Sequence, residues 1–187
     1  MDSVIYRLSF FLLITTWMSD AVIKQRPKNS KTCPKVHYMN NFDMERFNGT
    51  WYEIYTSMVN STVIERCDRM KLSIAPRGRL SIYRRFINAQ GLEVKSMGIA
   101  AEIEEGLVAF HYPAYMATNL YEIIFTDYEN YAILYYCIND FEFWIYSRNS
   151  IPNAQLLMLI FQKLRERNFT NVRIYRTDQV NCPMMGF

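Results

Sequence analysis

The feature that most constrains the fold of this chain is the alternation of apolar and polar residues in short segments between Thr50 and Ser147. In residues 68–75, for example, three apolar side chains share one face and charged or polar side chains share the other. Alternation with a period of two is typical of a half-buried β-strand. The pattern predicts eight strands, at residues 51–57, 68–75, 79–87, 92–103, 107–112, 120–126, 131–138 and 141–146.

The connections between these strands are short turns such as the Pro-Arg-Gly sequence at residues 76–78. Short connections favour an antiparallel up-and-down order, and closure into a barrel removes the exposed edges of the sheet. The apolar period then changes to that of an α-helix, with Ser150 as the expected N-cap, Pro152 in the first turn and an apolar stripe at Leu157, Ile160, Phe161 and Leu164. A short strand at residues 172–176 follows. The expected fold class is all-β with one helix: an eight-stranded antiparallel up-and-down barrel, a C-terminal α-helix and a short extra strand.

The first 21 residues are expected to be a secretory signal peptide. An apolar segment at residues 8–19 follows Arg7 and is too short to span a bilayer. Small residues at Ser19 and Ala21 fit the cleavage rule, which places the cut after Ala21. We therefore expect a secreted, extracellular protein that does not span the membrane, with one domain at residues 22–187.

An extracellular location determines how the cysteines are interpreted, because disulfides form in oxidising compartments. Four cysteines outside the signal, with no C-x-x-C pair and only two histidines in the chain, predict two disulfides and no metal site. Three connectivities are open for the set Cys33, Cys67, Cys137 and Cys182. Glycosylation motifs, which suit the same secretory route, begin at Asn48, Asn60 and Asn168.

The charge, the glycine spacing and the motifs of the sequence disfavour nucleic-acid binding, cofactor binding and catalysis. A net charge of +3, spread along the sequence, is too small to hold a nucleic acid. The six glycines do not cluster into a phosphate-binding or dinucleotide-binding loop, so no cofactor is expected. No G-x-S-x-G or H-E-x-x-H motif occurs, and we expect no catalytic residues and no enzymatic activity.

Three local motifs resemble those of the lipocalin family. Gly49-Thr-Trp51 resembles the family's G-x-W motif, Thr126-Asp127-Tyr128 resembles its T-D-Y turn, and Ser147-Arg148-Asn149 resembles its third motif. All three occur in order at plausible spacing. Within the family, the segment from Thr126 to the third cysteine and the C-terminal Thr-Asp-Gln-Val-Asn-Cys-Pro sequence resemble the apolipoprotein D group and its insect relatives. The resemblance covers nearly the whole mature chain and is weakest in the middle strands.

The resemblance implies structural roles for the motif residues. Trp51 would close the narrow end of the barrel, and the Arg148 guanidinium would stack on the indole while donating to nearby carbonyls. The residues with such roles are Gly49, Trp51, Thr126, Asp127, Tyr128 and Arg148. It also implies the disulfide pairs Cys33–Cys137 and Cys67–Cys182.

In such a barrel the alternation assigns an inward-facing set that would bind a ligand. The predicted ligand-binding residues are Met70, Leu72, Ile82, Ala100, Phe110, Tyr112, Tyr121, Ile123, Phe125, Leu134, Tyr136 and Trp144. Small residues on the strand at 92–103 leave volume beside the aromatic ones, although the same set could instead pack a dry core. Arg84 and Met116 are candidate rim contacts: Arg84 would bind a ligand carboxylate or be a solvated side chain at a strand end. Glu53 shares the inward parity, and structural hydrogen bonds are its expected role.

These observations predict a secreted carrier of a small hydrophobic ligand, such as a fatty acid, sterol, retinoid or bilin-type molecule. The alternative is a glycosylated extracellular interaction or signalling protein with a vestigial cavity and a cell-surface receptor as its partner. The two differ in whether the native protein carries a lipid.

Overall fold

The structure is a computed structural model that describes residues 36–57, 65–137, 141–169 and 172–183. The predicted signal peptide at residues 1–21, Cys33 and the motif residue Asn60 lie outside the described residues. Within the described part of the chain, no helix is both long enough and apolar enough to cross a membrane.

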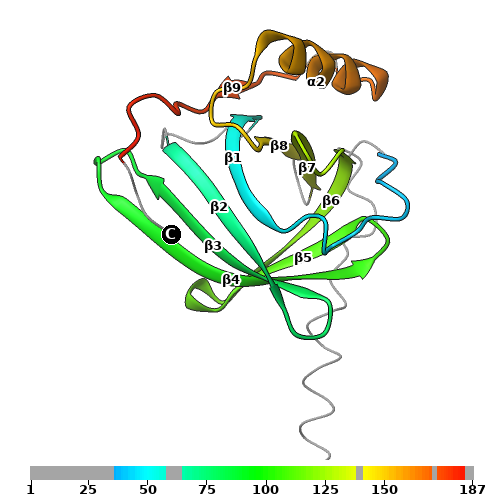
Figure 1. The fold of residues 1–187 in the computed structure, drawn as a ribbon, viewed down its shortest axis with the longest axis vertical. Coiled ribbons are helices and arrows are strands. Elements are labelled where there is room, and N and C mark those ends of the chain that lie inside the picture. Colours follow the sequence, from blue (N-terminus) through cyan, green and yellow to red (C-terminus); the bar gives the residue numbers. More distant parts are fainter. Residues whose placement is uncertain (1–35, 58–64, 138–140, 170–171, 184–187) are drawn as a thin grey trace, which may run out of the picture.

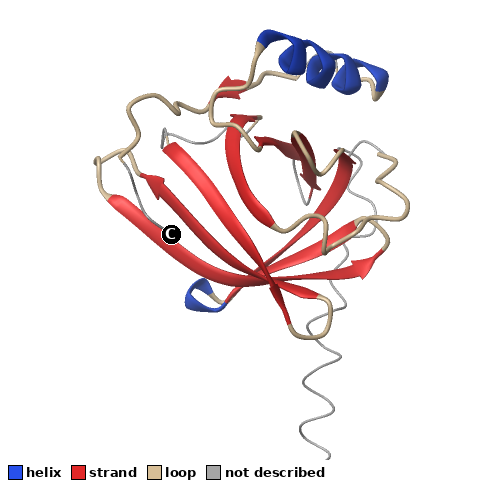
Figure 2. Cartoon of the chain, in the orientation of Figure 1, coloured by secondary structure: helices blue, strands red, loops and turns tan. Residues whose placement is uncertain are grey.

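Eight strands form a closed antiparallel barrel, as predicted (Figures 1 and 2). Each strand pairs with the next one in sequence, and β1 also pairs with β8, which closes the sheet. The limits agree closely with the predicted ones, except that β6 begins earlier, at Ala117. The strands are β1 Gly49–Thr56, β2 Arg66–Ala75, β3 Arg79–Ile87, β4 Glu93–Glu104, β5 Leu107–Tyr112, β6 Ala117–Thr126, β7 Tyr131–Cys137 and β8 Phe141–Ser147. A short 3₁₀ helix, η1 Pro113–Tyr115, joins β5 to β6.

The predicted helix is present as α2 Ala154–Glu166. Its N-cap is Asn153 and not Ser150, because the Asn153 side chain accepts a hydrogen bond of 2.9 Å from the backbone N–H of Leu156. The helix lies outside the barrel wall formed by β1, β7 and β8 (Figure 1). Its residues Ile160 and Leu164 are buried against that wall.

The structure therefore has two apolar cores. The first fills the inside of the barrel around Trp51, Met70 and Leu134, and the second lies between the outer wall and α2 around Ile54 and Phe143. Alternation along each strand supplies both, since successive side chains point to opposite faces of a strand.

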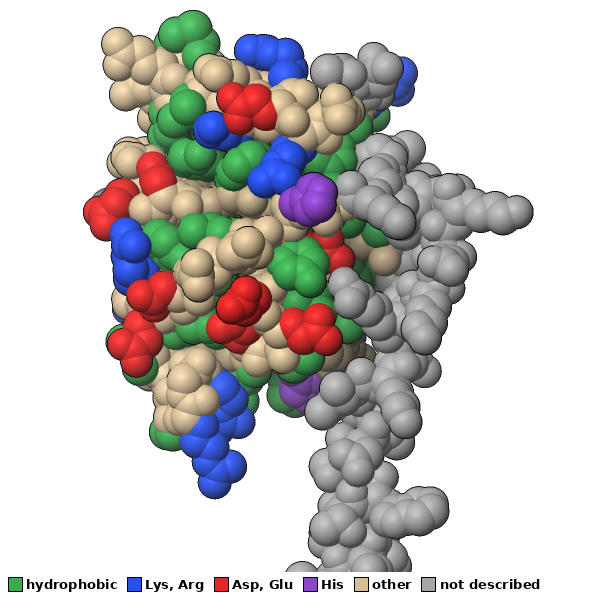
Figure 3. All heavy atoms as spheres, turned by 90° about the vertical axis from the view of Figure 1, so that its right-hand side faces the viewer, with side chains coloured by type: hydrophobic (Ala, Val, Ile, Leu, Met, Phe, Trp, Pro, Cys, Tyr) green, Lys and Arg blue, Asp and Glu red, His purple; other side chains and the backbone are tan. Residues whose placement is uncertain are grey.

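On the face seen in Figure 3, basic side chains are interspersed with acidic and apolar ones.

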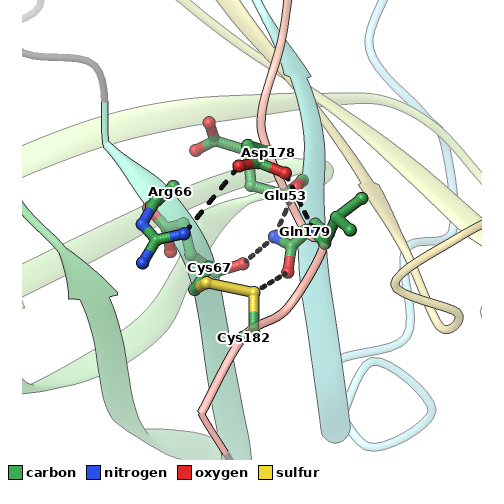
Figure 4. Close-up of a disulfide and its surroundings, with 8 residues drawn as sticks. Glu53, Arg66, Cys67, Asp178, Gln179 and Cys182 are labelled. Atoms are coloured by element: carbon green, nitrogen blue, oxygen red, sulfur yellow. Dashed lines mark hydrogen bonds and ion pairs between the residues drawn. A yellow bond between two sulfur atoms is a disulfide. The ribbon is translucent and has the colours of Figure 1, made fainter.

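The chain then returns to the barrel wall after α2. The predicted last strand is shorter than expected, β9 Tyr175–Arg176, and it pairs with β1 at Tyr55 and Thr56, beyond the point where β1 pairs with β2. Figure 4 shows the following segment lying beside both of these strands. The Gln179 side-chain amide donates to the backbone carbonyls of Glu53 on β1 (2.8 Å) and Asp68 on β2 (2.7 Å).

A disulfide fixes this C-terminal segment. Cys67 on β2 is bonded to Cys182, which confirms that predicted pair (Figure 4). Cys137 is also disulfide-bonded, and its predicted partner lies outside the described residues. The backbone N–H of Cys67 donates to the carbonyl of Asp178 (2.7 Å), so hydrogen bonds and a covalent bond act at the same point of the wall.

Candidate functional site

One end of the barrel is closed by Trp51 and Arg148. The guanidinium carbon of Arg148 lies 3.6 Å from the centroid of the Trp51 ring, and the indole N–H donates to the carbonyl of Phe47 (2.9 Å). Arg148 also donates to the backbone carbonyls of Tyr128 (2.9 Å), Thr50 (3.0 Å) and Asn48 (2.7 Å). A planar, permanently charged group can stack and donate in several directions at once, which explains the choice of arginine.

Gly49 is required beside this stack. Its φ of 101° lies in the region that residues with a side chain rarely adopt, and an added Cβ would lie 2.7 Å from the Arg148 Nη1 atom. Glycine thus lets the guanidinium approach the backbone of β1.

The Thr126–Tyr128 turn completes the same end. The Asp127 carboxylate accepts backbone hydrogen bonds from Glu129, Asn130 and Tyr131 (2.8–3.2 Å). Although partial burial opposes ionisation, these bonds and that from the Asn130 side chain lower the pKa of Asp127. The Tyr128 carbonyl then accepts from Arg148, which links the turn to the stack.

The interior towards the other end of the barrel holds a cavity of about 750 Å³. This volume lies within the range of sites that hold small molecules. An aromatic wall forms part of it, with the Tyr121 ring 5.3 Å from that of Trp144 and 4.9 Å from that of Phe110. Seven of the predicted ligand-binding residues line the cavity: Met70, Phe110, Tyr112, Tyr121, Leu134, Tyr136 and Trp144.

Four more of the predicted residues face the barrel interior but lie in packed core and not along the cavity: Leu72, Ile82, Ala100 and Ile123. Each is at most 1 % exposed. The dry-core interpretation therefore holds for the part of the interior nearer Trp51, and the cavity interpretation for the other part.

Phe125 was predicted to face the interior, and this is wrong. The register of β6 shifts between Ile123 and Phe125, so the extra residue reverses the alternation. Phe125 consequently packs on the outside of the barrel under α2, where the charged groups of Lys163 and Arg167 lie 5.6 and 4.9 Å from its ring centroid. Met116 is 93 % exposed after η1 and does not line the cavity, whereas its neighbours Tyr115 and Ala117 do.

Several lining residues were not in the predicted set. Glu142 shares the parity of Trp144, and Asn119 shares that of Tyr121, so alternation could have identified both. No local pattern indicates the others from the C-terminal segment, because its return to β1 depends on the tertiary fold. The additional lining residues are Glu53, Thr56, Glu65, Ser96, Tyr115, Ala117, Asn119, Glu142, Tyr146, Tyr175, Arg176 and Thr177.

Arg84 lines the cavity, but its guanidinium is already engaged. Its Nε and Nη2 groups donate to the Asp68 carboxylate, with Nε to Oδ2 at 3.0 Å, and Nη2 also donates to Glu65 at 2.8 Å. Although burial opposes the charge, the adjacent Asp68 carboxylate raises the pKa of Arg84. The predicted role of Arg84 as a receptor for a ligand carboxylate is therefore not favoured by this geometry.

Glu53 lies beside this ion pair on the cavity wall. It is 4 % exposed and accepts a hydrogen bond of 2.6 Å from the Thr177 hydroxyl, in keeping with the structural role expected for it. Burial, reinforced by the nearby Asp68 charge, raises the pKa of Glu53 to about 8. Glu53 is thus mainly protonated at neutral pH. Burial also raises the pKa of Glu65.

Phenol groups supply further polarity. The Tyr146 side chain lines the cavity, and its hydroxyl makes no hydrogen bond to any part of the chain that the structure describes. Burial raises the pKa of Tyr146 and of Tyr112, so both are neutral donors and acceptors.

Among residues 36–57, 65–137, 141–169 and 172–183, no three His, Cys, Asp or Glu side chains are arranged to hold a metal ion.

Two predicted glycosylation sites are described. Asn168 is exposed just after α2. Asn48 is half-buried, and its side-chain amide donates to the carbonyl of Glu45, a contact that an attached glycan would have to replace.

Comparison with known proteins agrees with this geometry. The profile of the lipocalin / cytosolic fatty-acid binding protein family matches residues 48–181. Apolipoprotein D of Bos taurus is 28% identical over 160 residues, covering 81% of this chain and 84% of the relative, and that of Cavia porcellus is 27% identical over the same shares.

Among solved structures, insecticyanin from the tobacco hornworm Manduca sexta superposes with a TM-score of 0.68 at 20% identity, covering 78% of this chain and 85% of insecticyanin. Lobster apocrustacyanin A1 gives a TM-score of 0.64 at 24% identity, covering 74% of this chain and 81% of its own. These two show the shared fold. With its three motifs, its closed eight-stranded barrel and the profile match over most of its length, the chain belongs to the lipocalin family and resembles apolipoprotein D within it.

Proposed function

We propose that this protein is a secreted carrier that binds one small hydrophobic molecule in the barrel cavity. The observation that carries the proposal is a cavity of about 750 Å³ with an aromatic wall, inside a barrel whose other end is closed by Trp51. The apolar N-terminal segment and the disulfides support secretion.

The driving force is removal of apolar ligand surface from water, worth about 25 cal/mol per Å². The rings of Phe110, Tyr121 and Trp144 meet edge to face, at interplanar angles of 70° and 84°, and form an apolar wall. Such a wall suits a sterol, a retinoid, a bilin-type molecule or an aliphatic chain. The carboxylates and phenols of the cavity would fix the polar part of the ligand and its orientation.

The test is native mass spectrometry of the protein purified from the medium of eukaryotic cells. We expect a complex with one small hydrophobic molecule, which organic extraction releases and identifies. A protein that is recovered empty, and that then fails to bind retinol, cholesterol and aliphatic probes in solution, would overturn the proposal.

One observation favours the alternative of an interaction protein. Three apolar side chains on the outer face of β4 are exposed: Met97 by 69%, Ile99 by 37% and Ile103 by 41%. Such a row suits contact with another protein. Cross-linking to cell surfaces by a protein with an empty cavity, lost on replacing Met97 with Lys, would support this function over carriage.

A further inference from the structure

The charged groups around the cavity are unevenly balanced. Glu53, Glu65 and Glu142 line it, and Asp68 lies directly behind Arg84. The basic lining residues are Arg84 and the exposed Arg176. Because Glu53 is mainly protonated at neutral pH, three carboxylates among the described residues, those of Glu65, Asp68 and Glu142, face two guanidinium groups. The cavity therefore favours positive charge over negative charge.

The cation deepest in this set is not available to an anionic ligand. Arg84 is held by two carboxylates, Asp68 and Glu65, and the Asp68 side chain is fully buried. A carboxylate placed beside Arg84 would also lie near these acids and would have to displace one of them. Removing one partner from a buried ion pair is costly, so the pair is expected to persist when a ligand binds.

A second, independent observation points to a ligand at the same place. Tyr146 is 7 % exposed and Ser96 is 6 % exposed, and both line the cavity. In the described part of the chain neither hydroxyl has a hydrogen-bond partner. Both hydroxyls therefore keep their hydrogen-bonding capacity at the wall of the cavity, where each can bind a polar group of a ligand.

We propose that the bound molecule carries a cationic amine on an apolar body, with its ammonium group beside the Glu65 carboxylate and within reach of the neutral Glu53 carboxyl group and the Tyr146 hydroxyl. This inference rests on the proposed carrier function and specifies its ligand class. An ammonium group has three donors and no acceptor, which matches carboxylate, phenol and serine oxygens. The aromatic rings of Tyr121 and Trp144 would contact the apolar body, and their faces also attract cations.

The test compares three probes with the same aliphatic chain: dodecylamine, dodecanoate and dodecanol, titrated at pH 7.4. A change in Trp144 fluorescence reports binding, because the aliphatic chain displaces water around this side chain, which lines the cavity, whereas Trp51 is buried at the other end. We expect the amine to bind at least tenfold more tightly than the carboxylate, with the alcohol between them. Trp144→Phe should remove the fluorescence response.

The matched variants are Glu65→Gln, on the cavity wall, and Glu105→Gln, exposed in the turn between β4 and β5. Glu65→Gln should reduce the amine-to-carboxylate ratio about tenfold, whereas Glu105→Gln should leave it unchanged. Tyr146→Phe keeps the ring and should weaken the amine more than the alcohol. If Glu65→Gln does not fold, Tyr146→Phe decides the test.

The outcomes separate the two proposals. If none of the three probes binds, and the protein is also recovered empty and fails to bind retinol and cholesterol, the carrier function itself is wrong. If dodecanoate binds as tightly as dodecylamine, the carrier function stands and the amine assignment is overturned. The same holds if Glu65→Gln leaves the amine-to-carboxylate ratio unchanged and Tyr146→Phe weakens the amine no more than the alcohol.

Discussion

The Arg148 guanidinium lies 3.6 Å from the centroid of the Trp51 ring and donates to backbone carbonyls of two segments of the closed end, Asn48 and Thr50 in one and Tyr128 in the other. The stack joins the first strand to the segment that follows the eighth. It lies apart from the cavity, and neither residue lines it. We therefore expect the stack to contribute to stability and closure, and ligand selection to depend on other residues.

We expect Arg148→Lys to lower the free energy of unfolding by about 1–3 kcal/mol, because lysine cannot stack as a plane or donate through a fork. Urea unfolding measures the loss. Affinity for dodecanol should change little. A changed ligand preference with unchanged stability would instead place Arg148 in the binding site.

Gly49→Ala should destabilise the barrel more than Gly78→Ala. Both glycines have positive φ, 101° and 66°, but a Cβ at Gly49 would meet Arg148 at 2.7 Å whereas one at Gly78 meets nothing within 4 Å. The difference isolates the steric contact from much of the backbone strain. Equal melting temperatures in the two variants would show that the space beside Arg148 is not limiting.

Glu53 should make stability depend on pH. Below about pH 4.5 this carboxyl is protonated in both the native and the unfolded chain, so ionisation of Glu53 takes nothing from the free energy of unfolding. As the pH rises, the unfolded chain releases its proton first, while native Glu53 holds its proton until the pH approaches 8, so stability is lost across this window. Glu53→Gln has a neutral side chain at every pH. The melting temperature of the variant minus that of the parent should therefore be several degrees larger at pH 8 than at pH 5. Parallel pH profiles would contradict the raised pKa.

Filling the cavity should abolish binding without unfolding the barrel. Ser96 lines the cavity, whereas Ser73 lies exposed on the outer face of β2, so Ser96→Trp and Ser73→Trp form a matched pair. Overpacking typically costs about 1–3 kcal/mol, which a barrel of this size can tolerate. Ala100 is a poorer site for this test because it lies in packed core. Equal binding of dodecylamine and dodecanol by Ser96→Trp and the parent would refute a luminal site.

The disulfide between Cys67 and Cys182 should be worth up to about 4–5 kcal/mol in the chain-entropy model, since the two cysteines are 115 residues apart. The double variant Cys67→Ser/Cys182→Ser should lose this stability in urea unfolding. It should also increase amide hydrogen exchange in β1 and β2 beside Gln179. Exchange rates equal to those of the parent would show that the hydrogen bonds of Gln179 hold the segment by themselves.

The sequence by itself determined the barrel and the helix, because each depends on a local pattern, and the closed end followed from the resemblance of three local motifs to those of the lipocalins. Alternation in β2–β5 needs only the pleat of a strand, and the three motifs carry their own turns and their glycine. The Cys67–Cys182 pair followed from resemblance, since spacing left three connectivities open.

Only the tertiary structure decided which interior residues line the cavity. One extra residue in β6 sends Phe125 to the outer wall, and no local pattern indicates such a bulge. The ion pair of Arg84 with Asp68, and the hydrogen bond from Thr177 to Glu53, join strands and a C-terminal segment that are distant in sequence. Their energies depend on burial and on neighbouring charges, which exist only once the barrel has closed.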